Sequence, residues 1–238
     1  MHATPTFAIQ RASERYFADH GWLKTYHSFS FADYVDPDNL NWGALRVLND
    51  DTIAAGTGFP LHPHRDMEIV TYVIDGQLEH RDSMGNRGIV GPGSVQFMSA
   101  GTGVRHSEFN ASKQHSLRLV QMWVLPGKTG TAPLYGQADF TVDDRRDRWL
   151  TIASGVEGVE APVHLTQRAV FAVARLEEAQ VEHRFSPGRL GFLFAAEGNV
   201  EANGAPLAAG DSVRIADLDR LTVGGRGEIL LWDVPPTA

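Results

Sequence analysis

The chain has 238 residues, of which 42% are hydrophobic and 21% charged, and this size allows either one large β domain or two domains of ordinary size. It contains no cysteine, which excludes disulfides, thiolate catalysis and cysteine-based zinc sites and fits a cytoplasmic location. The formal net charge is −8, and the absence of any Lys/Arg cluster argues against a direct nucleic-acid partner. The chain shows no secretory signal and no apolar run of about 18 residues, which argues against a membrane location.

Short runs rich in Val, Ile, Phe, Tyr and Trp alternate along the chain with clusters of Gly, Pro, Asn and Asp, and helical periodicity is scarce. This pattern is typical of an all-β sandwich or barrel. An alternating aromatic run over 22–31 predicts a core strand, in which we expect His27 to have hydrogen-bonded polar partners. The other predicted strands are 44–48, 68–74, 77–82, 94–99, 117–125, 149–153, 169–176, 191–196, 199–202, 211–215 and 228–232.

Two dipeptides, Asp75-Gly76 and Glu197-Gly198, each separate two predicted strands. A glycine at such a place supplies the positive φ of a tight hairpin turn. Aligning Gly76 with Gly198 also aligns the residues around them, which suggests two copies of one small β-barrel. A single sandwich with two coincidental hairpins is the alternative.

The join between the two copies is expected within 135–148. This stretch contains the charged run 143–147, which is typical of a solvated linker. We therefore expect a first domain at residues 1–138 and a second at residues 139–238.

Two pairs of metal-ligand candidates have i, i+2 spacing: His62 with His64, and His106 with Glu108. On an extended strand, side chains at i and i+2 point to the same face, so each pair can place two ligands in one space. Two such pairs can enclose one metal ion. Three neutral imidazoles and a carboxylate suit a first-row divalent transition metal. The alternative for His62 and His64 is a pair of partly exposed histidines beside a turn.

The second half of the chain does not repeat these ligands. The alignment of the two glycines places Arg184 and Ser186 where His62 and His64 would recur, and it places His183 one residue away, on the opposite face. We therefore expect a structural role for this half, either covering a face of the first half or shaping the entrance to its pocket.

Asp66 and Glu68 share strand parity with His64, so either side chain could orient an imidazole through its second ring nitrogen. The alternatives are that Asp66 closes a turn and that Glu68 pairs with a nearby Arg65. A direct ligand role for Glu68 is a further possibility.

Further side chains are candidates for the pocket, the core or the surface. We expect one of Gln121 and Trp123 to line the pocket, and core packing for Trp42, Phe59 and Met98. Three isolated histidines, His20, His80 and His115, are expected at the surface.

The ligand pairs lie within longer patterns. The run Gly56-x5-His62-x-His64-x3-Glu68-x7-Gly76 resembles the first cupin motif, and Gly101-x-Gly103-x2-His106-x3-Asn110 resembles the second. The interval before Gly76 is one residue longer than usual, and Gly101 replaces a common proline. The runs 27–34, 62–68 and 99–108 resemble the pirin family, especially its bacterial members similar to quercetin 2,3-dioxygenase, and this resemblance covers nearly the whole chain.

The resemblance implies a bicupin fold of two consecutive jelly-roll barrels with few short helices, the first binding metal and the second lacking ligands. It implies one divalent metal, usually Fe²⁺, with Mn, Co, Ni, Cu or Zn as alternatives. The ligands that it implies are His62, His64, His106 and Glu108, which leaves Glu68 outside the ligand set. Glu108 is also the candidate catalytic proton acceptor.

The activity that the resemblance implies is ring opening of flavonols with O2 and release of carbon monoxide. One alternative is a regulatory protein of the same family, without turnover, that binds a protein partner according to its metal or redox state. Another is a different cupin activity on an enediol, because one fold hosts many functions.

Overall fold

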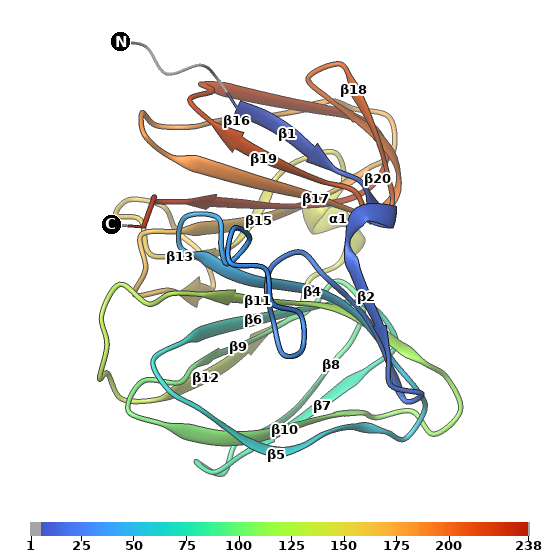
Figure 1. Ribbon diagram of the computed structural model, residues 1–238, viewed down its shortest axis with the longest axis vertical. Coiled ribbons are helices and arrows are strands. Elements are labelled where there is room, and N and C mark those ends of the chain that lie inside the picture. Colours follow the sequence, from blue (N-terminus) through green and yellow to red (C-terminus); the bar gives the residue numbers. More distant parts are fainter. Residues whose placement is uncertain (1–5, 238) are drawn as a thin grey trace.

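The computed structural model describes residues 6–237, and β-strands make up most of it. Two β domains are stacked on one another, the N-terminal half below and the C-terminal half above in Figure 1. The all-β prediction with few short helices is confirmed. In residues 6–237, no helix is long and apolar enough to cross a membrane.

The first domain consists of a seven-stranded sheet and a four-stranded sheet, ordered β12-β9-β6-β11-β4-β3-β2 and β5-β10-β7-β8. The apolar core between these sheets includes Leu23, Val73 and Leu119. The strands are β2 (Tyr16–Asp19), β3 (Leu23–His27), β4 (Leu45–Ile53), β5 (Gly58–His64), β6 (Glu68–Asp75), β7 (Leu78–Asp82), β8 (Arg87–Val90), β9 (Val95–Ser99), β10 (Val104–Asn110), β11 (Leu117–Val124) and β12 (Leu134–Ala138).

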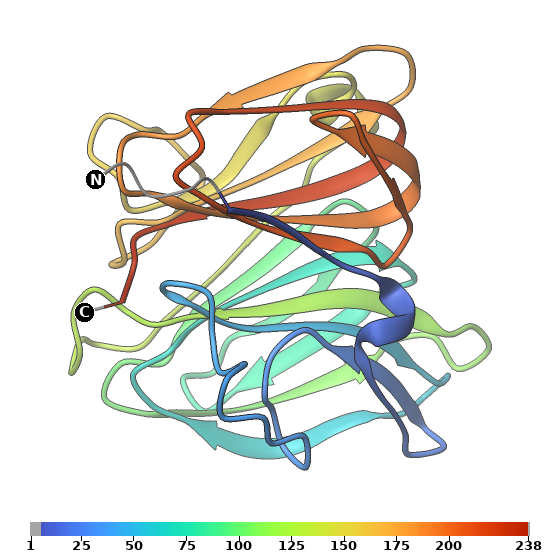
Figure 2. The ribbon, with the colours of Figure 1, turned by 45° about the horizontal axis from the view of Figure 1, so that its top comes forward.

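The second domain is a strongly bent nine-stranded sheet. It includes β1, which pairs with β19, so the start of the chain crosses over to the later domain (Figure 2). Its strands are β1 (Thr6–Gln10), β13 (Leu150–Ser154), β14 (Val163–His164), β15 (Val170–Leu176), β16 (Val181–Arg184), β17 (Leu190–Ala202), β18 (Ala205–Ala208), β19 (Ser212–Ala216) and β20 (Arg220–Val234). A 3-10 turn η1 (Ala12–Glu14) follows β1, and the helix α1 (Val142–Arg145) precedes β13. The domain boundary at residue 138, at the end of β12, stays a prediction.

A large cluster of buried apolar side chains lies between the two domains. It joins Tyr72 and Met122 of the first domain to Phe171 and Trp232 of the second. Arg145, in the stretch expected to be a solvated linker, is buried, and its Nε donates to Glu228 Oε1 at 2.9 Å. The prediction of a solvated linker is therefore wrong at Arg145, because its charge is paired inside the interface.

Gly76 and Gly198 do have positive φ, 86° and 77°, but neither forms a hairpin. Gly76 lies where the chain passes from β6 in one sheet to β7 in the other. Gly198 lies inside β17, a single strand that pairs with β19 over 190–194 and with β18 over 199–202. The hairpin prediction is wrong, but the two glycines occupy the same point of one repeated topology. A Cβ there would lie 2.8 Å from Ser116 O or 2.1 Å from Arg226 O.

Glu68, at the start of β6, connects the first domain to a loop of the second. Its carboxylate is fully buried and accepts the backbone N–H groups of Thr166 at 2.7 Å and Gln167 at 3.0 Å. The expectation that it orients an imidazole is wrong. Asp66 has φ 46° and accepts the backbone N–H of Gly130 at 2.7 Å, so the turn alternative describes it correctly.

We predict that Glu68→Ala lowers the free energy of unfolding by about 2–4 kcal/mol, because two buried N–H groups lose their acceptor. Urea denaturation measures this change. The matched control is Glu79→Ala on β7, whose partner Arg81 is exposed, and about 1 kcal/mol or less is expected for it. Equal losses in the two variants would contradict the structural role of Glu68.

Candidate metal centre

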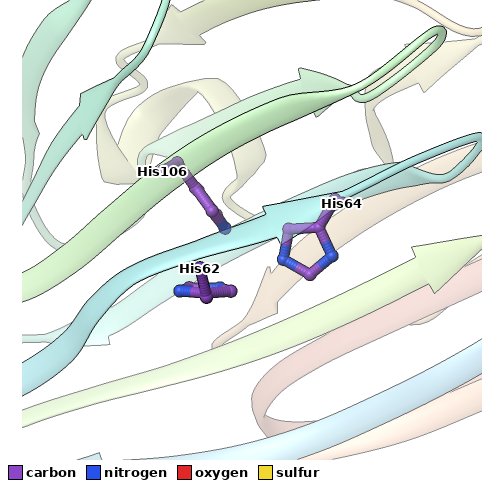
Figure 3. Close-up of side chains that lie close together, drawn as sticks. All are labelled: His62, His64 and His106. Atoms are coloured by element: carbon purple, nitrogen blue, oxygen red, sulfur yellow. The ribbon is translucent and has the colours of Figure 1, made fainter.

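Three histidines meet where β5 pairs with β10. His62 lies opposite His106 in the antiparallel register, and His64 lies opposite Val104. The ring centroids are 4.4 Å apart for His62 and His106, 4.8 Å for His62 and His64, and 4.9 Å for His64 and His106 (Figure 3). Pro63 is tolerated between the two ligand candidates because β5 is the edge strand of its sheet.

The ring nitrogens of His62 and His106 have contacts that bear on metal binding. His62 Nδ1 lies 2.7 Å from Pro60 O, and His106 Nδ1 lies 3.5 Å from His80 Nδ1. His106 Nε2 is buried and has no hydrogen-bond partner. In His106, one ring nitrogen therefore faces His80 while the other is left free, which is the usual arrangement in metal-binding histidines. The donor set fits a first-row divalent metal.

The imidazoles of His64 and His106 are neutral at pH 7. Burial, together with the neighbouring histidines, lowers the pKa of His64 to about 4 and that of His106 to about 3. Protons therefore do not compete strongly for the free ring nitrogens near neutral pH.

Glu108 is buried at the edge of this cluster. A register shift relative to β5 separates it from His106. Its Oε1 accepts Gln96 Nε2 at 2.9 Å, and its Oε2 accepts Gln121 Nε2 at 2.7 Å. One carboxylate oxygen of Glu108 and one ring nitrogen each of His80 and His106 lie within 4.8 Å of one another. The structure thus brings Glu108 beside His106, with two amides holding its carboxylate.

His80 is buried at 1% exposure, so the expectation of a surface position is wrong. It lies on β7, which pairs with β10 and places Asp82 opposite His106. His80 Nε2 lies 3.3 Å from Asp82 Oδ2, and its ring stacks on Tyr135 at 4.4 Å. Asp82 and His80 therefore support His106 from behind. The alternation of His80 with Leu78 on one strand was a sequence signal for its burial.

A cavity of about 170 Å³ lies between the two sheets of the first domain, beside the histidines. Its lining is Leu23, Thr25, His27, Phe31, Asn49, Phe59, Asp51, His62, His64, Glu108, Gln121 and Trp123. Both Gln121 and Trp123 line it, and so does Phe59.

The sequence did not indicate Thr25, Asn49 or Asp51 as cavity residues. His27 is buried as expected, but its Nδ1 has no hydrogen-bond partner, contrary to the expectation. Trp42 and Met98 lie elsewhere: Trp42 Nε1 donates to Gly191 O at 2.9 Å, and Met98 packs in the core with Ile69.

The equivalent place in the second domain is filled. His183 lies opposite Leu221, as His62 lies opposite His106, so the expectation that it faces the other way is wrong. The connection from β16 to β17, 185–189, is two residues longer than the connection from β5 to β6, 65–67, so the spacing before the two glycines differs between the domains. Leu221 belongs to the apolar core, and His183 Nε2 contacts Asp233 Oδ2 at 2.9 Å. Within residues 6–237, the groups able to hold a metal lie in the first domain.

Comparisons with known proteins agree with both domains. The pirin family model matches residues 9–124, and the model of the quercetinase C-terminal cupin domain matches residues 151–234. A quercetin 2,3-dioxygenase of Escherichia coli is 41% identical over 96% of this chain and 98% of its own length. A pirin-like protein of Caulobacter vibrioides is 46% identical over 87% of this chain and 89% of its own.

Solved structures agree as well. The bacterial pirin YhhW of Escherichia coli, in complex with nickel(II), superposes with a TM-score of 0.89 at 39% identity, covering 97% of this chain and 99% of that one. The predicted bicupin architecture is therefore confirmed.

We predict that His80→Phe, which keeps a ring beside Tyr135, weakens metal binding by about 10–100-fold, because His106 loses its orienting partner. Competition of Ni²⁺ between the protein and a chromogenic chelator measures the affinity. His115→Phe, at an exposed histidine, is the control and should bind as the unmodified protein does. An unchanged affinity in His80→Phe would contradict the orienting role.

The pKa of His27 gives a prediction for pH. Burial, together with the nearby Arg15 and His20, lowers it to about 4 from an ordinary 6.5. Between pH 6.5 and pH 4, His27 therefore binds a proton in the unfolded chain but stays neutral in the folded protein. The resulting stability is present above pH 6.5 and is lost as the pH falls toward 4.

We expect the unfolding free energy of the unmodified protein to fall by about 2 kcal/mol more than that of His27→Gln between pH 7.5 and 5. Urea denaturation of the metal-free proteins at both pH values measures the difference. For the control His115→Gln, the difference in unfolding free energy from the unmodified protein should be the same at both pH values. The same result for His27→Gln would show that His27 is protonated freely in the folded protein.

Proposed function

The chain belongs to the pirin family, and we propose that it is a metal-dependent dioxygenase that opens the ring of quercetin-like flavonols. In this reaction a flavonol and O2 give a ring-opened ester and carbon monoxide. The observation that carries the proposal is the free, buried Nε2 of His106 among three clustered imidazoles, next to a cavity lined by aromatic side chains. The name of the related protein of Escherichia coli supports the same substrate class.

The proposed ligands are His62, His64, His106 and Glu108, and the proposed metal is one Fe²⁺ ion. The same donors accept Mn, Co, Ni, Cu or Zn, so affinity alone does not select among them. When bound, the metal supplies Lewis acidity and open coordination positions for ligands. The nickel(II) complex of the related pirin supports a divalent metal in this fold.

The protein's own groups position the substrate and receive its proton. Glu108 reaches the cavity from β10 and is the proposed acceptor of the proton of the flavonol 3-hydroxyl. The amides of Gln96 and Gln121 donate to its two oxygens and so fix the direction of the carboxylate. Trp123 and Phe59 flank the cavity and exclude water from the flavonol ring.

We predict that protein loaded anaerobically with one equivalent of Fe²⁺ consumes O2 and releases an equal amount of CO when quercetin is added. His62→Ala should lower this rate by at least about 100-fold, because it removes a ligand. An oxygen electrode and a CO assay measure the two gases. The exposed His115→Ala is the control and should keep the full rate.

The proposed activity would be contradicted if fully metal-loaded protein consumed neither quercetin nor O2. It would also be contradicted if His62→Ala turned over quercetin at the rate of the control. In the first case, the metal site would stand without this reaction.

A further inference from the structure

The wall of the cavity that the seven-stranded sheet forms includes four polar side chains on two neighbouring strands, Thr25, His27, Asn49 and Asp51. Thr25 and His27 are two residues apart on β3, and Asn49 and Asp51 are two residues apart on β4. The strands pair so that Thr25 lies opposite Asp51 and His27 opposite Asn49. All four therefore point to the same face of the seven-stranded sheet, whereas the proposed ligands come from the four-stranded sheet.

Each of these four side chains is at most 4% exposed and has a buried polar atom without a hydrogen-bond partner. The atoms are Thr25 Oγ1, His27 Nδ1, Asn49 Oδ1 and Asp51 Oδ1. Buried polar atoms are nearly always paired in folded proteins, so four such atoms on one cavity wall need an explanation. Burial raises the pKa of the Asp51 carboxyl to about 7, and the nearby Thr25 hydroxyl opposes this rise without a hydrogen bond of standard geometry to it.

The opposite face of the same strands shows the contrast. Asp50 lies between Asn49 and Asp51 but points away from the cavity, and both of its carboxylate oxygens accept the Arg118 guanidinium, at 3.0 Å and 3.1 Å. Polar groups on that face are thus paired within the protein. The unpaired atoms on these strands are specific to the cavity face, where a ligand can reach them.

The chemistry of the wall indicates what it binds. The oxygens of Asn49 and Asp51 are hydrogen-bond acceptors, and His27 is neutral at pH 7 because burial lowers its pKa to about 4. The wall therefore suits a ligand that brings hydroxyl donors. The cavity of about 170 Å³ is close in size to an engineered cavity of about 150 Å³ that holds one benzene ring.

We propose that Thr25, His27, Asn49 and Asp51 are a recognition wall that accepts the hydroxyl groups of one aromatic ring, so that the site selects polyhydroxylated rings over unsubstituted ones. The identification of that ring with part of a flavonol rests on the proposed function. A site built to hydrogen-bond a hydroxyl discriminates strongly against an analogue that lacks it, because the acceptors then stay unpaired.

The test compares quercetin with 3-hydroxyflavone, which keeps the 3-hydroxyl but lacks the other hydroxyl groups. Calorimetric titration of the Ni²⁺-loaded protein without O2 measures binding in the absence of turnover. We expect quercetin to bind at least about tenfold more tightly. Two variants, Thr25→Val and Asn49→Leu, remove acceptors while nearly keeping the shape of the side chain. Each should weaken the binding of quercetin but not that of 3-hydroxyflavone, and so reduce the preference to about threefold or less.

The matched control is Thr52→Val. Thr52 neighbours Asp51 on β4 but does not line this cavity, so the preference should persist. Urea denaturation provides a readout that separates recognition from a structural role. A side chain that serves the ligand leaves its acceptor unpaired in the free protein, so Thr25→Val should be no less stable than the unmodified protein.

The wall would be ruled out if the unmodified protein had no preference for quercetin. Equal weakening of both ligands, or no weakening of either, in Thr25→Val and Asn49→Leu would also rule it out. A preference for quercetin that these variants abolish, in a protein that consumes no O2, would support the wall and contradict the proposed dioxygenase activity.

Discussion

The antiparallel pairing of β5 with β10 is the constraint on which the site depends, because it sets His62 directly opposite His106. Strand side chains alternate between faces, so this one pair also turns His64 inward, and a slip of one residue would turn it outward. β10 pairs on its other side with β7, which brings His80 and Asp82 behind His106. Strand β10 thus positions both the three clustered histidines and the side chains of His80 and Asp82 behind them.

The two domains show what this constraint allows. Their topology is the same, but in the second domain Leu221 replaces His106 and packs in an apolar core. The equivalent place in that domain is occupied by apolar core, whereas the first domain keeps a cavity with polar atoms unpaired at its wall. Residues such as Phe171 and Trp232 of the second domain pack against the outer face of the seven-stranded sheet. The second domain therefore supports the sheet that forms one wall of the cavity in the first domain.

The sequence predicted the features that depend on local geometry. The i, i+2 spacing brought His62 and His64 to one face because strand periodicity is a local property. It did not predict which sheet each strand joins, so the predictions of a hairpin turn at Gly76 and of a surface position for His80 are wrong. Their positions depend on pairings with distant strands. Polar residues on both faces of β4 hide its alternation, which is why the predicted strand ended at residue 48, short of Asn49 and Asp51.

The central claim is that three imidazoles and a carboxylate hold one divalent metal in the first domain. X-ray absorption spectroscopy of the protein loaded with one equivalent of Fe²⁺ tests it most directly. We expect a shell with three imidazole nitrogens at about 2.1 Å and further oxygen ligands. The imidazole scattering should weaken in His62→Ala. A shell of oxygen ligands alone, with no imidazole scattering, would contradict the account.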